Sequence, residues 1–469
     1  MTGHNFHRSI LREYDIRGIV GETLFEADAE WIGRAYGTVL TRKLGRTPII
    51  ALGRDGRLSS PQMAAALLRG LTSTGAKVLD VGCGPTPMAY FAVYHLETDG
   101  GIMVTGSHNP PTHNGFKMMI GRKPFYGAAI QQLATLAASN DVMRGSGTQE
   151  SRPVLTAYVD RLASELADVD LSGLAIGWDA GNGAAGEAMT LLTKKLPGKH
   201  VLLHERIDGT FPAHHPDPTE PKNLVDLQQA VAQQKLDLGI AFDGDGDRIG
   251  TIDAKGRILW GDQMLAILAR DVLKDRPGGT IIADVKASQV LFDEVARLGG
   301  KPMMWKTGHS LIKVKMAEVQ SPLGGEMSGH IFFADRFYGF DDALYAAVRL
   351  LKAVVRHGGD LAALRDQLPT LVSTPELRFE CADERKFKVV EQVRDRLKGE
   401  AATFDDIDGV RVNTRDGWWL LRASNTQAVL VARAEARDQA GLARLKSSLC
   451  RHLESSGVAV PVEMAQGAA

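Results

Sequence analysis

Three aspartates stand at alternate positions of one glycine-rich loop, at Asp243, Asp245 and Asp247. The apolar run from Leu238 to Phe242 precedes them and is typical of a buried strand. Carboxylates this close repel one another unless a cation or protons compensate. Oxygen ligands favour a hard cation, and Mg²⁺ suits a site that handles phosphate. An EF-hand would need a glutamate where Ala254 stands. Because the buried strand disfavours a plain charged turn, we predict a magnesium site.

A serine lies in a second loop, Thr-Gly-Ser-His-Asn-Pro, at residues 105–110. The run Gly-Ile-Met-Val before it predicts a short buried strand, and Pro110 and Pro111 then fix φ and remove amide donors. A serine on a tight turn after a strand presents its hydroxyl for reaction. A plain Ser/Asn turn is the alternative, and three further polar, glycine-rich loops weigh against it.

Two of those loops carry groups suited to a sugar and to a phosphate. Glu326 and Ser328 can accept from and donate to sugar hydroxyls. Residues 422–427, Arg-Ala-Ser-Asn-Thr-Gln, combine a guanidinium with short donors that match a tetrahedral phosphate. Alone, each loop has a plain turn as its alternative, and a lone histidine such as His309 is more often structural than catalytic. Four positive charges nevertheless stand beside such loops, at Arg17, Lys117, Arg248 and Lys286.

Length and composition bound the class of protein. A chain of 469 residues is too long for one core, so about three or four domains are expected. The hydrophobic content of 44% and the charged content of 24% are ordinary for a soluble globular protein. A net charge of -1 gives no electrostatic case for nucleic acid or an anionic membrane. The three cysteines are few and widely spaced, which predicts reduced thiols in a cytoplasmic protein: Cys83, Cys381 and Cys450.

One layout recurs three times along the chain: a strand ending near an aspartate, a glycine-rich loop and a helix. The repeats begin at Ile49, Leu174 and Thr280, and each continues through a second strand to one of the serine, aspartate and glutamate loops. Three similar α/β units predict that these loops surround a shared cleft. The segment from Phe6 to Gly21 is charged and bounded by glycine, so we expect a surface loop there. The C-terminal hundred or so residues predict an antiparallel α+β module with a hairpin around Asp416.

The joints between these units are predicted near Arg152, Ala254 and Leu368. They divide the chain into an α/β domain with the serine loop at 1–152, an α/β domain with the aspartate loop at 153–254, an α/β domain with the glutamate loop at 255–368, and an α+β domain with the arginine loop at 369–469.

Taken together, the four loops resemble those of the α-D-phosphohexomutase superfamily, and within it the bacterial bifunctional phosphomannomutase/phosphoglucomutase family. The serine, aspartate, glutamate and arginine loops resemble its phosphoserine, metal, sugar and phosphate loops. Further matches are Tyr-Asp-Ile-Arg-Gly at 14–18, His-His-Pro-Asp-Pro at 214–218 and Trp-Lys-Thr-Gly-His-Ser-Leu-Ile-Lys at 305–313. One departure is Gln427, where the family usually has a smaller residue after the phosphate-loop threonine.

The resemblance implies three mixed α/β domains and a C-terminal domain like the TATA-binding protein, arranged around a central cleft. It implies a phosphoryl carrier at Ser107 and a Mg²⁺ ion held by Asp243, Asp245, Asp247 and a phosphoserine oxygen. Further catalytic positions are Arg17, His108, Lys117, Arg248 and His309. Arg17, Lys117 and His309 are all candidates for the general base. Substrate-binding positions are Tyr14, Lys286, Gly308, Glu326, Ser328, His330, Arg422, Ser424, Asn425 and Thr426.

The activity that the resemblance implies is the interconversion of hexose 1-phosphates and 6-phosphates, of glucose, mannose or both, through a 1,6-bisphosphate intermediate. Glucose 1,6-bisphosphate is the expected activator, hexose phosphates are the expected ligands, and a monomer is expected. A phosphoglucosamine mutase and a single-sugar phosphoglucomutase are the alternatives on the same scaffold. The Thr-Gly-Ser and Gly-Glu-Met-Ser sequences argue against the first of these. A non-catalytic sensor and a Mg²⁺-dependent phosphatase are more distant hypotheses.

Overall fold

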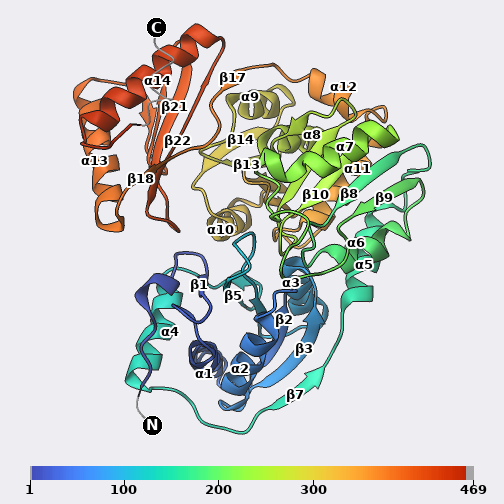
Figure 1. Ribbon diagram of the computed structural model, residues 1–469, viewed down its shortest axis with the longest axis vertical. Coiled ribbons are helices and arrows are strands. Elements are labelled where there is room, and N and C mark those ends of the chain that lie inside the picture. Colours follow the sequence, from blue (N-terminus) through green and yellow to red (C-terminus); the bar gives the residue numbers. More distant parts are fainter. Residues whose placement is uncertain (1–2, 461–469) are drawn as a thin grey trace.

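The computed structural model describes residues 3–460 and contains four β-sheets, three of them flanked by helices in α/β units (Figure 1). The first two and last nine residues of the expected outer domains therefore lie outside the described part. The first sheet has the order β1-β5-β4-β2-β3-β7, with β6 paired to β5. Its strands are β1 (Ile16–Ile19), β2 (Ile49–Arg54), β3 (Lys77–Cys83), β4 (Gly100–Val104), β5 (His113–Ile120), β6 (Lys123–Pro124) and β7 (Thr148–Ser151).

Helices cover both faces of this first sheet. Alternate residues of β2 point to opposite faces. Ile50 and Leu52 join a cluster with α1 (Glu26–Leu44), α2 (Ser60–Thr72) and α4 (Ala128–Ser139), whereas Ala51 joins a second cluster with α3 (Thr86–His95). The first cluster belongs to this unit alone, and the second continues into the second and third units.

The second and third sheets have the orders β12-β11-β10-β8-β9 and β14-β13-β15-β16. Their strands are β8 (Ala175–Asp179), β9 (Lys199–Leu203), β10 (Leu238–Phe242), β11 (Ile249–Asp253), β12 (Ile258–Leu259), β13 (Thr280–Asp284), β14 (Lys301–Trp305), β15 (Leu323–Gly325) and β16 (Ile331–Phe333). The accompanying helices are α5 (Leu155–Ala163), α6 (Gly186–Thr193), α7 (Val225–Gln234), α8 (Gly261–Asp275), α9 (Gln289–Arg297), α10 (His309–Val319), α11 (Ala343–Arg356) and α12 (Leu361–Asp366).

The threefold repeat predicted from the sequence is present in the sheet order. Three parallel strands and one antiparallel strand follow one another as β3-β2-β4-β5, as β9-β8-β10-β11 and as β14-β13-β15-β16. In every unit the polar loop singled out in the sequence connects the third parallel strand to the antiparallel one. The expected fold class of three mixed α/β units is confirmed.

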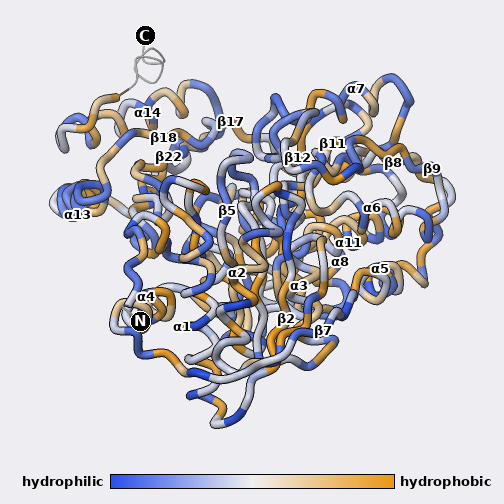
Figure 2. The backbone as a smooth tube through the Cα atoms, turned by 60° about the horizontal axis from the view of Figure 1, so that its bottom comes forward, coloured by the Kyte–Doolittle hydropathy of each residue, from blue (hydrophilic) through white to orange (hydrophobic). Residues whose placement is uncertain are grey.

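The C-terminal module has an antiparallel sheet of order β17-β22-β21-β20-β19, with β18 also paired to β22. Its strands are β17 (Val372–Ser373), β18 (Leu377–Glu380), β19 (Phe404–Asp405), β20 (Val410–Asn413), β21 (Gly417–Ala423) and β22 (Val429–Ala436), and its helices are α13 (Asp383–Gly399) and α14 (Gln439–Glu454). The predicted hairpin between β20 and β21 is present, with Asn413 opposite Trp418. Of these elements, α13 is hydrophilic along most of its length (Figure 2).

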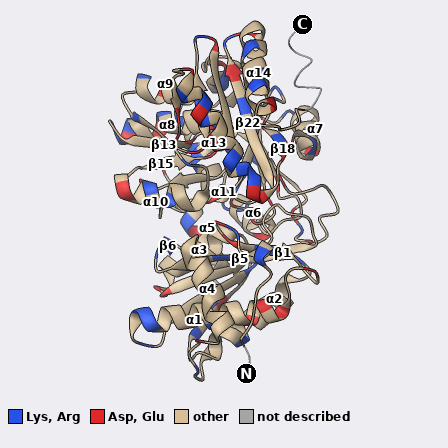
Figure 3. Cartoon of the chain, turned by 90° about the vertical axis from the view of Figure 1, so that its left-hand side faces the viewer, with Lys and Arg blue, Asp and Glu red and all other residues tan. Residues whose placement is uncertain are grey.

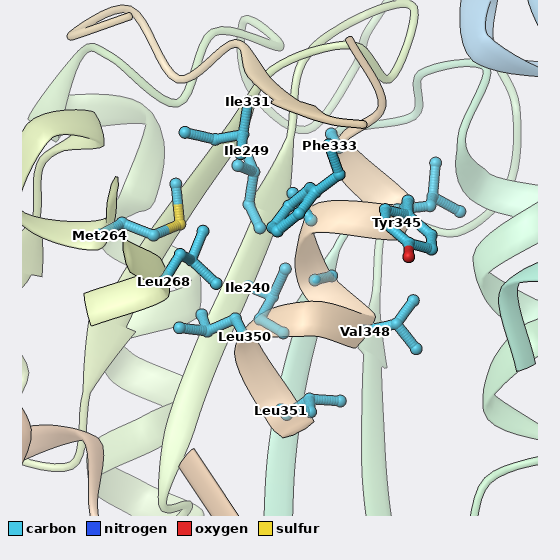
Figure 4. Close-up of a cluster of buried hydrophobic side chains, with 14 of the residues drawn as sticks. Ile240, Ile249, Met264, Leu268, Ile331, Phe333, Tyr345, Val348, Leu350 and Leu351 are labelled. Atoms are coloured by element: carbon cyan, nitrogen blue, oxygen red, sulfur yellow. The ribbon is translucent and has the colours of Figure 1, made fainter. Parts of the chain in front are cut away.

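One continuous apolar cluster joins the three α/β units. Helix α11 lies at its centre and packs against β10, β11, β16 and α8, so the second and third sheets share their core (Figure 4). The charged residues are not segregated by sign. Acidic and basic residues are mixed over the face shown in Figure 3, in keeping with the small net charge. Within residues 3–460, no helix combines the length and the apolar character needed to cross a bilayer.

The prediction of a surface loop from Phe6 to Gly21 is wrong for part of that segment, because Ile16–Ile19 forms β1. This strand pairs antiparallel with β5, placing Ile16 opposite the buried Phe116. Only four residues long, it lies at the edge of the sheet with one neighbour. Short edge strands tolerate flanking charges that a central strand would not.

Candidate active site

The serine, aspartate and glutamate loops, which come from three different sheets, meet in the structure. The Ser107 Oγ atom lies 3.3 Å from Asp243 Oδ2, which joins the first loop to the second. An isolated antiparallel β-bridge between Arg248 and His330 joins the second loop to the third. All three loops leave equivalent strands of repeated units, and the packing of these units around one apolar cluster brings the loops together.

Ser107 is held in a conformation that its residue type rarely adopts. Its φ is +52°, in the left-handed region, and its backbone N–H donates to Thr105 Oγ1 at 2.9 Å. A non-glycine residue in this region costs about 1–3 kcal/mol and needs support from its surroundings. The residue is 2% exposed, and its Oγ lies 3.1 Å from His108 Nδ1.

Arg57 supplies that support, and the sequence reasoning missed it. Its guanidinium is fully buried and donates to four carbonyls of this segment, those of Ser107, Asn109, Pro110 and His113, at 2.6–3.0 Å. A Cβ atom on Gly106 would lie 2.5 Å from Arg57 Cζ, so only glycine permits this approach. The available signal was a further charged, glycine-rich segment where β2 ends, Gly-Arg-Asp-Gly-Arg at 53–57.

The three aspartates of the aspartate loop are fully buried, and one ligand atom from each lies within 4.8 Å of the others. Burial and the neighbouring charges of Asp245 and Asp247 raise the pKa of Asp243 well above its ordinary value. Lys117 Nζ compensates in part, because it donates to Asp245 Oδ2 at 2.7 Å and also to Asp247 Oδ2. Asp245 Oδ1 has no hydrogen-bond partner among the described residues. A buried, unpartnered carboxylate oxygen beside two others is the donor set that a hard cation fits.

The side chains of the glutamate loop form a chain of contacts that leads to the aspartate loop. Glu326 Oε1 accepts from the Gly308 N–H at 2.7 Å, and its Oε2 lies 3.0 Å from His330 Nδ1. His330 Nε2 lies 3.3 Å from Asp247 Oδ1 and 3.4 Å from Arg248 Nε. Burial lowers the pKa of His330, but the charge of Asp247 outweighs it and raises that pKa to about 9. Ser328 Oγ lies 3.2 Å from His330 Nδ1, so six of the predicted residues share this cluster.

The three candidate bases have different environments. Burial lowers the pKa of Lys117, but Asp245 and Asp247 outweigh it and raise that pKa. Burial and the charge of Lys313 instead hold the pKa of His309 well below its ordinary value, so its imidazole is neutral at neutral pH. Arg17 hydrogen-bonds Asp15 and lies 3.5 Å from Asn109 Oδ1 in the serine loop. Burial likewise lowers the pKa of His108.

The predicted phosphate loop lies on the C-terminal module and contacts the first unit through a side-chain hydrogen bond. Asn425 Nδ2 donates to Tyr14 Oη at 2.6 Å, and Tyr14 Oη donates to the carbonyl of Thr307 at 2.8 Å. Arg422 is buried and pairs with Asp408 at 2.9 Å, so a phosphate would compete with that carboxylate.

The other residues of the predicted phosphate loop and Lys286 have partners within the C-terminal module or at its junction with the third unit. The Ser424 hydroxyl accepts from the N–H groups of Thr426 and Gln427 at 3.4 and 3.2 Å, and both of these residues are exposed. Lys286 pairs with Glu376 at 3.0 Å, at the junction of the third unit and the C-terminal module.

Comparisons with known proteins agree across the whole chain. Models of phosphoglucomutase/phosphomannomutase α/β/α domains I, II and III match residues 8–141, 156–256 and 260–372, and the model of the C-terminal domain matches residues 376–452. A phosphomannomutase/phosphoglucomutase of Pseudomonas aeruginosa is 42% identical over 97% of both chains. A phosphoglucomutase of Neisseria gonorrhoeae is 41% identical over 96% of this chain and 97% of its own length.

A solved structure shares the architecture as well. The crystal structure of a phosphoglucomutase/phosphomannomutase family protein from Burkholderia thailandensis superposes with a TM-score of 0.90 at 43% identity. It covers 96% of this chain and 98% of its own. The chain described here therefore belongs to the phosphoglucomutase/phosphomannomutase family.

Proposed function

We propose that this chain is a phosphohexomutase, which interconverts the 1- and 6-phosphates of glucose and mannose through a phosphoserine at position 107 and a 1,6-bisphosphate. The observation that carries this proposal is the position of Ser107, whose Oγ lies 3.3 Å from the buried aspartate cluster. The names of relatives at 41–44% identity, phosphomannomutase/phosphoglucomutase and phosphoglucomutase, support it.

Phosphoryl transfer requires that charge on the equatorial oxygens be compensated while the transferring group is held in line. Asp243, Asp245 and Asp247 would hold Mg²⁺ together with an oxygen of the phosphoserine. The ion supplies Lewis-acid compensation of phosphoryl charge. Arg248, which immediately follows the cluster, would add positive charge beside the same oxygens. Arg57 would keep Ser107 aimed at this position, so the serine need not reorganise during transfer.

A sugar hydroxyl is a weak nucleophile and needs a base. Among the candidates we propose His309, because its imidazole is neutral whereas Lys117 is held as a cation by two aspartates. Lys117 would then stabilise the aspartate cluster and the transferring group. Arg17, beside Asn109 of the serine loop, would contact the phosphoserine.

Substrate binding divides between the sugar and its distant phosphate. Glu326, with Ser328 and His330 beside it, would bind the O3 and O4 hydroxyls, which glucose and mannose share. Gly308 positions Glu326 through its N–H. Arg422, Ser424, Asn425 and Thr426 would bind whichever phosphate is not reacting, with Tyr14 and Lys286 at the edges of that site. Closure of the C-terminal module over the substrate would exclude water from the phosphoserine.

Several finer properties belong to the same proposal. We propose activation by glucose 1,6-bisphosphate, a monomeric state, a cytoplasmic location and hexose phosphates rather than nucleic acid or membranes as ligands. We also propose the domain division 1–152, 153–254, 255–368 and 369–469, which the ranges of the four family matches support.

A single-sugar phosphoglucomutase is the second candidate, because some relatives at 41–42% identity are named phosphoglucomutase alone. The test is a steady-state assay with the 1-phosphates of glucose, mannose and glucosamine, with Mg²⁺ and glucose 1,6-bisphosphate present. The proposal predicts conversion of glucose and mannose 1-phosphate to their 6-phosphates at comparable kcat/KM. Conversion of glucose 1-phosphate alone would favour the second candidate, and release of free phosphate without isomerised sugar would overturn both.

A further inference from the structure

We propose that the second α/β unit contains a further cation site, formed by Asp179, His204 and His214 and suited to a borderline divalent ion such as Zn²⁺. One ligand atom from each residue lies within 4.8 Å of the other two. Asp179 ends β8 and His204 directly follows β9, the neighbouring parallel strand, at the edge of the second sheet (Figure 1). His214 reaches them from the following loop. This site does not depend on the proposed mutase activity.

The two nitrogens of His214 have partners that point to a cation. Nδ1 lies 3.0 Å from the carbonyl oxygen of His215, and Nε2 lies 2.9 Å from Asp179 Oδ2. Because a carbonyl oxygen only accepts, the Nδ1 atom carries a proton, and a neutral ring then has its lone pair at Nε2. That lone pair faces a carboxylate oxygen, so two acceptors stand at hydrogen-bond distance. A proton on Nε2, or a metal ion bound by both atoms, would remove this repulsion.

His204 shows the arrangement expected of a second ligand. Its Nε2 lies 2.9 Å from Asp226 Oδ2, and donation to that carboxylate leaves Nδ1 unprotonated and able to bind a metal. A carbonyl or carboxylate partner on the remote ring nitrogen is typical of metal-binding histidines. His204 also has a φ of +51°, a left-handed conformation that is uncommon outside glycine. Its side chain is 25% exposed, which provides a path for an ion.

The ligand types distinguish this site from the aspartate cluster. Two imidazoles and one carboxylate suit Zn²⁺, whereas an all-oxygen cluster suits Mg²⁺. Asp179 is fully buried, and its other oxygen accepts from the Gly181 N–H at 2.8 Å, so the ligand is already oriented. Three protein ligands would leave the fourth tetrahedral position to water.

The two segments that carry Asp179 and His214 also hold the metal loop of the candidate active site. The N–H of Ala184 donates to the carbonyl of Gly244 at 2.9 Å, and the N–H of Gly244 donates to the carbonyl of Pro216 at 3.0 Å. An ion bound by both Asp179 and His214 would therefore link the two segments that hydrogen-bond to Gly244. Bound Zn²⁺ should stabilise this unit against unfolding.

A proton competes for the same position. Burial lowers the pKa of His214, but its hydrogen bond to Asp179 and the charge of that carboxylate outweigh burial and raise the pKa. A bare imidazolium–carboxylate pair is thus the alternative that an experiment must exclude.

The test is equilibrium dialysis of the chelator-treated full chain against Zn²⁺, with a large excess of Mg²⁺ present to occupy the aspartate cluster. His204→Ala removes one ligand at a partly exposed position, and His7→Ala removes an exposed imidazole elsewhere as the matched control. The proposal predicts that wild type and His7→Ala bind one more Zn²⁺ than His204→Ala, and that Zn²⁺ raises the Tm of the first two only. Asp226→Asn, which removes the outer partner, should weaken Zn²⁺ binding by about tenfold.

Equal Zn²⁺ uptake by wild type and His204→Ala would overturn the proposal, because other thiols or carboxylates would then account for binding. So would the absence of Zn²⁺ uptake by wild type in excess Mg²⁺. If His204→Ala does not fold, Asp226→Asn decides the question, since unchanged affinity in that variant contradicts the predicted site.

Discussion

The proposed substrate site has two ends, one at Ser107 and the aspartates and the other at the predicted phosphate loop, and the fold holds these two ends in different ways. The serine, aspartate and glutamate loops come from three sheets joined by one continuous apolar cluster. The phosphate loop belongs to a module with a separate core, joined to the third unit by a small apolar cluster of Val285, Trp418 and Leu420. One end is therefore part of a single body, whereas the other is on a body of its own.

Polar contacts follow the same division. At the first end, Arg57 holds the serine loop through four carbonyls and Lys117 ties the aspartates together. At the other end, Asn425 reaches Tyr14 through one hydrogen bond, and Arg411 and Arg433 donate to carbonyls of residues 285–287. The reacting groups of the proposed mechanism thus lie where the donors belong to one body, whereas the proposed anchor for the non-reacting phosphate lies on the C-terminal module.

The largest effect is expected at the fixed end. Ser107→Ala removes the proposed phosphoryl acceptor, so turnover should fall by several orders of magnitude while folding is retained. Steady-state kinetics and the thermal unfolding midpoint together check this prediction. If Ser107→Ala retains mutase activity near that of wild type, Ser107 is not the phosphoryl acceptor and the proposed roles of the two ends are wrong.

A somewhat smaller loss is expected when the charge of the metal loop changes without a change in shape. Asp245→Asn should lower kcat more than it raises KM, because the charge it places acts chiefly in the transition state. Titration with Mg²⁺ should show weakened activation. Full activity of the wild-type enzyme in excess chelator would refute the metal assignment.

The end of the proposed site that lies on the C-terminal module should respond more moderately. One charge-assisted contact of an arginine with a phosphate contributes about 1.5–3 kcal/mol, so Arg422→Ala should lower kcat/KM by about ten- to a hundredfold. The loss should be similar for glucose 1-phosphate and mannose 1-phosphate, because the epimers share the phosphate. Arg415→Ala, an exposed arginine of the same module, is the matched control. A loss confined to one sugar would mean that Arg422 contacts the sugar instead.

The smallest expected effect is on the pH dependence of the free energy of unfolding, and it arises in the core that the three α/β units share. Asp342 caps α11, accepts from Tyr158 and is fully buried, and burial raises its pKa to about 7. The folded form retains a proton that the unfolded form releases near pH 4, so stability should fall as the pH rises from about 4 through 7. The slope is at most about 1.4 kcal/mol per pH unit.

Denaturant unfolding across this pH range should show that slope in wild type and lose it in Asp342→Asn. Because Asp342 lies in the core of the three α/β units, the C-terminal module should unfold with the same midpoint in both proteins. An unchanged slope in the variant would contradict the predicted role of Asp342.

The sequence predicted those features that depend on local pattern. Buried strands ending in glycine-rich loops gave the three repeats, and the Asp416 turn gave the hairpin between β20 and β21. It failed at Ile16–Ile19, because charge around a short run conceals an edge strand. Arg57 was missed because its partners are backbone carbonyls about 50 positions away. Every residue has such a carbonyl, so the sequence does not show which of them accept a hydrogen bond.

The contacts between modules could not be predicted from local sequence patterns either. The pairing of Asn425 with Tyr14 spans 411 positions, and that of Lys117 with Asp245 spans 128. Only the relative placement of the sheets decides such pairs, and it depends on the packing of α11 and its neighbours. The residue types at Tyr14, Lys117 and Asn425 could be singled out through family resemblance, but their partners could not.

The division of roles between the two ends is tested most directly by intact-mass spectrometry of three proteins before and after exposure to glucose 1,6-bisphosphate. The proteins are wild type, Ser107→Ala and Arg422→Ala. The account predicts that wild type and Arg422→Ala each gain the mass of one phosphoryl group, more slowly in the variant, and that Ser107→Ala gains none. A phosphoryl group on Ser107→Ala, or none on wild type, would contradict it.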